Sequence, residues 1–96
     1  MTEGQASISA DILARYAGDV ALEVDGVRRL AGRRGVKIEG DEGAVRVELH
    51  LVVEWGASIP DVGRTVQQRV AEYLGSMADV EPESVDVIVD EVGPLA

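Results

Sequence analysis

The residues from Ala44 to Trp55 alternate between apolar and polar side chains more regularly than any other part of the chain. The apolar series is Val45, Val47, Leu49, Leu51 and Val53, and the intervening positions are Arg46, Glu48, His50, Val52 and Glu54. Successive side chains of a β-strand point to opposite faces of its sheet, so this pattern predicts a strand with one buried side. A sheet with one apolar face must then be covered on that face by helices or by a second sheet.

Two amphipathic helices are predicted on either side of this strand. The first begins after Ser9, a typical N-cap residue, and ends near Asp25-Gly26, where glycine can adopt a positive φ. The second begins at Ile59, with Pro60 in its first turn. Its apolar positions recur at three- and four-residue steps and are Ile59, Val62, Val66, Val70, Tyr73, Leu74 and Met77.

Two shorter strands complete the expected fold. Val36 to Glu39 precedes the long strand and is joined to it by a predicted hairpin turn at residues 40–43, whereas Val85 to Val89 follows the second helix. Val27–Gly35 is expected to be a basic connection. We therefore predict an α+β fold in the order α-β-β-α-β, a three-stranded mixed sheet with two helices packed on one face.

The expected organisation is one domain with short tails. Residues 8–92 form this domain, and residues 1–7 and 93–96 are expected to be flexible tails. The sheet face opposite the helices is predicted to be open and charged.

The composition excludes several kinds of chemical site. The chain has no cysteine, which rules out disulfides, thiolate metal sites and cysteine nucleophiles. Its one histidine, His50, is expected among carboxylates on the polar face of the long strand, and a role as general base would require a surrounding pocket. No phosphate-binding loop, nucleophile elbow or metalloprotease motif occurs. We therefore expect no enzymatic activity, no cofactor and no bound metal.

Positive and negative charges are separated along the sequence. The net charge is −9, yet five of the nine basic residues fall within ten positions, and no Lys or Arg follows Arg69. These five form the candidate interaction site, called here the basic segment: Arg28, Arg29, Arg33, Arg34 and Lys37. Either they contact an acidic surface of another copy of the chain, or they neutralise acids within their own monomer. The sequence leaves both alternatives open.

Trp55 ends the long alternating run. It continues the odd-numbered apolar series, so we expect it to lie in the core between the strand and the second helix. The alternative is an exposed aromatic anchor for a protein partner, since aromatic residues concentrate binding energy at interfaces.

Gly32-Arg33-Arg34-Gly35 suggests an alternative function. It matches the Gly-x-x-Gly loop with which KH domains clamp a nucleic-acid backbone, so a KH-like module for single-stranded nucleic acid is the second hypothesis. The KH loop, however, joins two helices, and a four-residue match arises easily by chance in a chain with 11 glycines. The negative net charge also repels phosphates. Nucleic acid is therefore not the partner we expect.

A series of short segments in a fixed order resembles the alkaline shock protein family of envelope stress response proteins from Gram-positive bacteria. The segments are Ile8-Ser9, Ala14, Ala17, Glu23-Val24-Asp25-Gly26-Val27, Gly35-Val36, Val52-Val53-Glu54-Trp55-Gly56, Ile59-Pro60, Val66-Gln67-Gln68-Arg69-Val70 and Val85-Asp86-Val87-Ile88-Val89. The resemblance spans roughly residues 8–92. One departure is Trp55, which stands where tyrosine is common in the family.

The resemblance implies a non-enzymatic stress-response protein that associates with the membrane through a partner carrying the transmembrane helices. Because the family has no established catalytic residues, none is carried over. No stretch of this chain approaches 18 consecutive apolar residues, and its first residues lack the pattern of a signal peptide. We expect a cytoplasmic protein, peripheral at the inner face of the membrane, that associates with itself and with a membrane-anchored partner.

Overall fold

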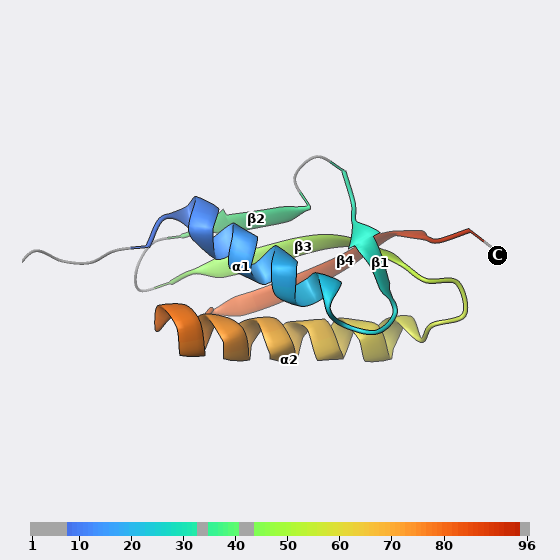
Figure 1. Cartoon of the computed structure of the whole chain (residues 1–96). Coiled ribbons are helices and arrows are strands. Elements are labelled where there is room, and N and C mark those ends of the chain that lie inside the picture. Colours follow the sequence, from blue (N-terminus) through green and yellow to red (C-terminus); the bar gives the residue numbers. More distant parts are fainter. Residues whose placement is uncertain (1–7, 33–34, 41–43, 95–96) are drawn as a thin grey trace, which may run out of the picture.

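The computed structural model describes residues 8–32, 35–40 and 44–94 (Figure 1). Its elements are α1 (Ala10–Leu22), β1 (Val27–Leu30), β2 (Val36–Glu39), β3 (Arg46–Val53), α2 (Ile59–Ala78) and β4 (Ser84–Val92). The predicted α+β fold is confirmed, and one strand is added to it. This strand, β1, lies in the segment Val27–Gly35 that was expected to be an irregular connection, which corrects that part of the prediction.

β1 and β2 lie one after the other along the same edge of β3. Both pair with it antiparallel: Leu30 lies opposite Leu51, and Val36 lies opposite Leu49. Between them, the Ala31 N–H donates to the His50 carbonyl (2.8 Å) and the His50 N–H donates to the Gly35 carbonyl (2.7 Å). β1 and β2 therefore form one interrupted edge of the sheet. Although the sheet has four strands, it is therefore only three strands wide, as the sequence predicts.

β4 pairs with the other edge of β3 and runs parallel to it, so the sheet is mixed, as predicted. Both helices lie on one face of this sheet (Figure 1). The rings of Tyr16 on α1 and Tyr73 on α2 meet edge to face with centroids 5.6 Å apart. Glu23, which follows Tyr16 in the chain, pairs with Arg69, which precedes Tyr73, so the two helices run antiparallel.

The core forms where the apolar side of β3 meets the helices. Val52, predicted among the outward positions, is buried although it lies outside the core cluster, next to an irregularity in the pairing of β3 with β4. Val47, Leu49, Leu51 and Val53 are fully buried, as the alternation predicts. They pack in one cluster with residues of the helices that are also fully buried: Ala17 and Ala21 of α1, and Val66, Val70 and Leu74 of α2. The predicted apolar stripe of α2 is not buried over its whole length, because Ile59 and Met77 at its two ends are exposed. The 20-residue helix thus carries apolar side chains beyond the covered part of the sheet.

Each helix begins with a serine N-cap. The Ser9 hydroxyl oxygen accepts a hydrogen bond from the Ile12 N–H, which confirms Ser9 as the N-cap of α1. Ser58 caps α2 in the same way, with Pro60 in the first turn. α1 ends at Leu22, a few residues before the expected Asp25-Gly26. Gly26 has the predicted positive φ, +97°. The predicted turn at residues 40–43 lies largely outside the described residues, although the strands that it joins pair as a hairpin.

Gly26 and Gly56 offer a matched pair of substitutions, since their φ values are +97° and +92°. A Cβ at Gly56 would meet no atom within 4 Å, whereas one at Gly26 would lie 2.6 Å from Cγ2 of Val62. Gly56→Ala should therefore lower the free energy of unfolding by about 1–2 kcal/mol, the penalty for a left-handed backbone conformation with a Cβ. Gly26→Ala should cost roughly 1–3 kcal/mol more because it also overpacks the start of α2. Urea unfolding measures both, and equal losses would contradict the packing described here.

Candidate functional site

The described members of the basic segment all pair with glutamates of the same chain. The nitrogen–oxygen distances are 3.7 Å for Arg28–Glu54, 3.5 Å for Arg29–Glu91 and 3.2 Å for Lys37–Glu39. Neutralisation within the monomer, one of the two alternatives, thus occurs at these positions. The side chains are largely exposed, so the pairs are weak and open to exchange with an external carboxylate. Arg33 and Arg34 lie outside the described residues, and their role stays a prediction.

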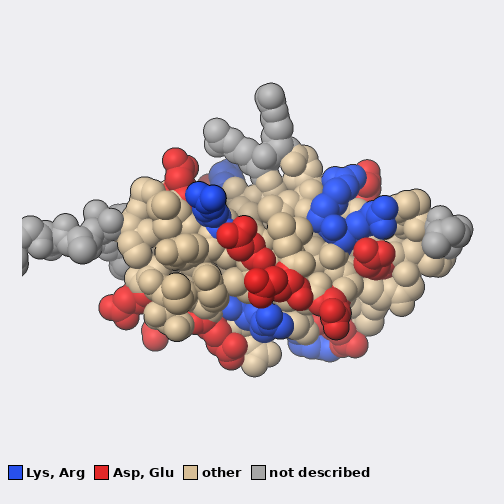
Figure 2. Space-filling model, viewed as in Figure 1, with Lys and Arg blue, Asp and Glu red and all other residues tan. Residues whose placement is uncertain are grey.

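The fold divides the basic segment between two places. Arg28 and Arg29 lie on β1, at the end of the molecule where β3 and β4 finish. Lys37 lies farther along the same edge, on β2 opposite Glu48. In Figure 2, Lys and Arg gather near the β1 end, at the right of the view, with Asp and Glu beside them, while Asp and Glu also run across the middle of this face and prevail on the lower rim at the left.

The Gly32–Gly35 connection joins β1 to β2, two strands on the same edge of the sheet. The KH loop that it matches in sequence joins two helices. The structural setting of the motif therefore differs from the one that supports nucleic-acid binding in KH domains.

The prediction that Trp55 lies in the core is wrong, because 62% of this residue is exposed. β3 ends at Val53, and the chain turns immediately afterwards, with a φ of +92° at Gly56. The alternation that places odd-numbered residues in the core holds only within the strand and does not extend to Trp55. The exposure that the second alternative, an aromatic anchor for a protein partner, requires is present, and the anchoring role stays a prediction.

The fluorescence of Trp55, the only tryptophan, reports this exposure directly. The emission of the folded protein should be red-shifted and strongly quenched by acrylamide, because solvent reaches the indole ring. Unfolding in urea should change the emission maximum little. A blue-shifted maximum that resists quenching at low protein concentration would show that the indole is buried within the monomer.

His50 lies on the open face of the sheet between two carboxylates, as the sequence predicts. Its Nε2 is 2.7 Å from Glu48 and its Nδ1 is 3.1 Å from both oxygens of Asp90 on the neighbouring strand. The hydrogen bonds to Glu48 and then to Asp90 raise the pKa of His50 above its ordinary value. An imidazolium that donates both N–H groups to carboxylates has no free lone pair. This arrangement therefore does not favour a general base.

A depression of about 540 Å³ lies beside His50, along β2 and the start of α1. Asp11, Lys37 and Glu48 are among its lining residues. Within it His50 and Glu48 are bonded to each other, and Lys37 is bonded to Glu39. Most of the polar side chains that line the depression are therefore already paired within the protein and are not free to bind a ligand.

The His50 contacts predict a pH-dependent contribution to stability. Because the pKa of His50 is raised in the folded state, the stabilisation is complete below the unfolded pKa of about 6.5 and disappears as the pH rises through the folded pKa. His50→Gln should therefore lower the free energy of unfolding more at pH 5.5 than at pH 9. Urea unfolding at both pH values measures this difference. The same loss at each pH would mean that the imidazolium is not stabilised by Glu48 and Asp90.

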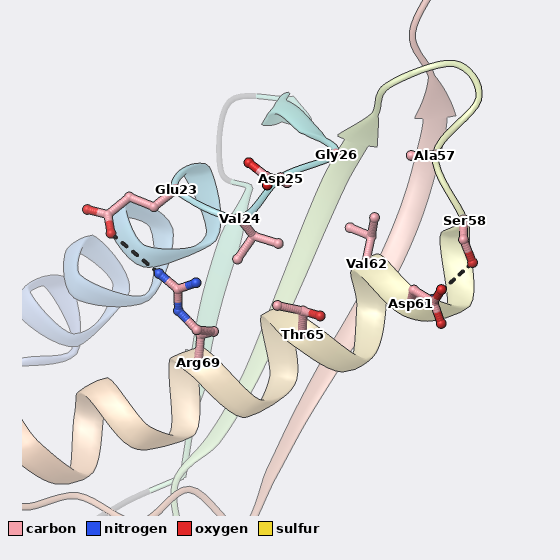
Figure 3. Close-up of a pocket in the computed structure, with 10 residues that line it drawn as sticks. All are labelled: Glu23, Val24, Asp25, Gly26, Ala57, Ser58, Asp61, Val62, Thr65 and Arg69. Atoms are coloured by element: carbon pink, nitrogen blue, oxygen red, sulfur yellow. Dashed lines mark hydrogen bonds and ion pairs between the residues drawn. The ribbon is translucent and has the colours of Figure 1, made fainter.

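A second hollow, of about 490 Å³, lies between the turn after α1 and the start of α2 (Figure 3). Its polar groups mostly satisfy one another. Arg69 reaches across from α2 to Glu23, with 3.7 Å between the charged atoms, and the Ser58 hydroxyl oxygen accepts from the Asp61 N–H. Asp61 in turn pairs with Arg64. We assign no small-molecule site to this hollow, because it lacks a convergent set of unengaged polar groups.

The carboxylates of the acidic second half differ in their surroundings, which sequence reasoning could not resolve. Glu83, Asp90 and Glu91 pair with Arg46, His50 and Arg29. By contrast, Asp79, Glu81 and Asp86 form no salt bridge with another described residue, and neither does Asp11 at the start of α1. Asp19, Asp25 and Glu72 are also outside these pairs, so carboxylates without a basic partner among the described residues occur along the helices and just before β1 as well. Asp79 and Glu81 place two of them where α2 ends.

Fold and surface together define a small α+β domain with an apolar core and charged exterior. The profile of the alkaline shock protein 23 family, which is described as having a cell envelope-related function, matches residues 1–94. The chain therefore belongs to this family, and the resemblance to alkaline shock proteins is confirmed.

Two curated relatives come from Bacillus subtilis (strain 168). YqhY is 25% identical over 99 residues, which cover 88% of this chain and 73% of the relative. YloU is 23% identical over 106 residues, which cover 93% of this chain and 88% of the relative. Both are described as uncharacterized proteins.

Solved structures with a similar fold include forms of the MamM CTD. One form has a TM-score of 0.66 at 15% identity, covering 86% of this chain and 99% of the other. A copper form of a MamM CTD variant has a TM-score of 0.67 at 16% identity, covering 90% of this chain and 100% of the other. At this level of identity the likeness concerns the fold alone.

Proposed function

We propose that this protein is a non-enzymatic envelope stress-response protein that acts as a scaffold, associating with itself and with other proteins. Its family has a cell envelope-related function. The apolar side chains of β3 and most of those of the helices are used in the core. The described polar side chains that line the two larger hollows are largely engaged with one another. The surface left for function is the charged exterior, which suits protein recognition.

The separation of charge is the observation that carries this proposal. Arg28 and Arg29 lie at one end of the domain, and Asp79 and Glu81, which have no basic partner among the described residues, lie near the other. Complementary patches at different places on one protein produce a heterologous contact, which propagates unless its geometry closes a ring. Salt should weaken such a contact because exposed charges are screened.

Membrane association is the second part of the proposal. None of the helices in the described ranges is long and apolar enough to cross a bilayer. We therefore assign attachment to the inner face of the membrane to a partner protein that carries the transmembrane segment. The protein itself would be cytoplasmic.

The mass of the protein in solution tests self-association. Light scattering at low salt should give a mass above that of the monomer, which falls as salt is added. The variant Arg33→Glu/Arg34→Glu should associate less, because it reverses the charge of the basic segment outside the described ion pairs. Arg64→Glu/Arg69→Glu is the matched control, with the same change of charge on α2. A salt-independent monomer for the wild type would overturn the proposed self-association.

Purification of the tagged protein from its own cells tests the partner. Co-purification of a small membrane protein, identified by mass spectrometry, is the expected result. Recovery of ribosomal or RNA-processing proteins instead, together with a gel shift of single-stranded RNA at physiological salt, would favour the KH-like alternative over the scaffold.

A further inference from the structure

The seam between the two helices ends in exposed apolar side chains. Tyr16 and Tyr73 meet within the seam, and the helices run antiparallel. Ile12 is one turn from Tyr16 toward the start of α1, and Met77 is one turn from Tyr73 toward the end of α2. Residues four apart share a helix face, so both extend the seam in the same direction. They are 39% and 52% exposed, which leaves the end of the seam uncovered.

This apolar pair has acidic surroundings. Asp11 precedes Ile12 in the chain, and Asp79 and Glu81 follow Met77 closely. The last turn of α2 contains no basic residue, so its free carbonyl groups add partial negative charge at the same place. We call this surface the Met77 end: Asp11, Ile12, Met77, Asp79 and Glu81.

The opposite end combines arginines with exposed apolar groups. Trp55 follows Glu54, the partner of Arg28. Val92, 42% exposed, lies opposite Val53 at the end of β4. The Arg28 side chain crosses the next residue, Gly93, since a Cβ there would lie 2.7 Å from Cδ of Arg28. We call this surface the Trp55 end: Arg28, Arg29, Trp55 and Val92.

The two surfaces cannot meet within one copy. α2 starts shortly after β3 ends and runs back along the sheet, so its C-terminus lies at the far end of the domain (Figure 1). Its 20 residues span about 30 Å. The Trp55 end, whose arginines are paired with exposed glutamates, and the acidic, apolar Met77 end are therefore available only to other molecules.

We propose that a second copy of this chain is the occupant, with the Trp55 end of one copy docked on the Met77 end of the next. This rests on the proposed self-association and specifies its surfaces. Tryptophan and arginine are enriched among residues that dominate binding, and a flexible methionine adapts to an aromatic ring. Asp79 and Glu81 would receive the arginines in place of their exposed partners Glu54 and Glu91. Both surfaces are small, so each contact is weak and dependent on concentration.

Two variants, each blocked at one end, test this arrangement. Trp55→Glu removes the aromatic ring and adds an acid to the Trp55 end, whereas Met77→Lys adds a base to the Met77 end. Each is more than half exposed in the wild type, and thermal unfolding followed by circular dichroism checks that the fold is kept. Met77→Ser serves as a second, uncharged variant. Ile88→Lys is the control, because it makes the same charge change as Met77→Lys on the open face of the sheet.

Sedimentation velocity at low salt gives the result. Trp55→Glu alone and Met77→Lys alone should be monomers, while Ile88→Lys should associate like the wild type. An equimolar mixture of the two blocked variants keeps one intact pair of ends, so it should form a dimer and nothing larger. Association of either blocked variant alone, or a mixture that stays monomeric, would overturn the head-to-tail arrangement. A wild type that is itself monomeric would instead refute the self-association on which it rests.

Discussion

Burial of β3 is the constraint on which the rest of the structure depends. Both of its edges are paired, with β1 and β2 on one side and β4 on the other. Its odd-numbered side chains are fully buried from Val47 to Val53. A one-residue slip of any neighbouring strand would turn its apolar side chains to solvent, so the alternation along β3 also fixes the register of its neighbours. The helices are then held on the face of the sheet that carries the core residues of β3.

This arrangement also determines which surfaces remain for function. The helices cover one face of the sheet, and the other carries paired charges such as those around His50. Exposed apolar groups are left mainly where elements end: Ile12 at the start of α1, Met77 at the end of α2, and Trp55 after β3. Because α2 runs back along β3, these groups fall at opposite ends of the domain. The fold thus produces two distinct ends, one acidic and one with arginines whose glutamate partners are exposed.

Much of the fold could be predicted from the sequence, because local chemistry and burial agree there. The alternation of β3, the cap at Ser9, Pro60 in the first turn of α2 and the apolar stripe of α2 each have a direct physical signature. β1 has none, since its four residues include two arginines, and its pairing with β3 depends on the backbone. Trp55 and Met77 are more exposed than the periodicity predicts, because periodicity shows which face a residue occupies but not where the neighbouring element stops.

The candidate site was only partly predictable for a related reason. The sequence shows a basic segment and an acidic second half, but ion pairing depends on which strands become neighbours. The pairing of Arg29 with Glu91 joins residues 62 positions apart, and it requires both β1 and β4 to lie beside β3. Which acids lack a basic partner among the described residues therefore became clear only from the fold. That distinction is what locates the acidic end.

Hydrogen exchange at low and at high protein concentration tests this account most directly, because it reports core and surfaces in one measurement. At both concentrations the amides of β3 should exchange most slowly, at the rate set by global unfolding. At high concentration, added protection should appear only at the Met77 end and the Trp55 end. Fast exchange in β3, or added protection centred on the open face around His50, would contradict it.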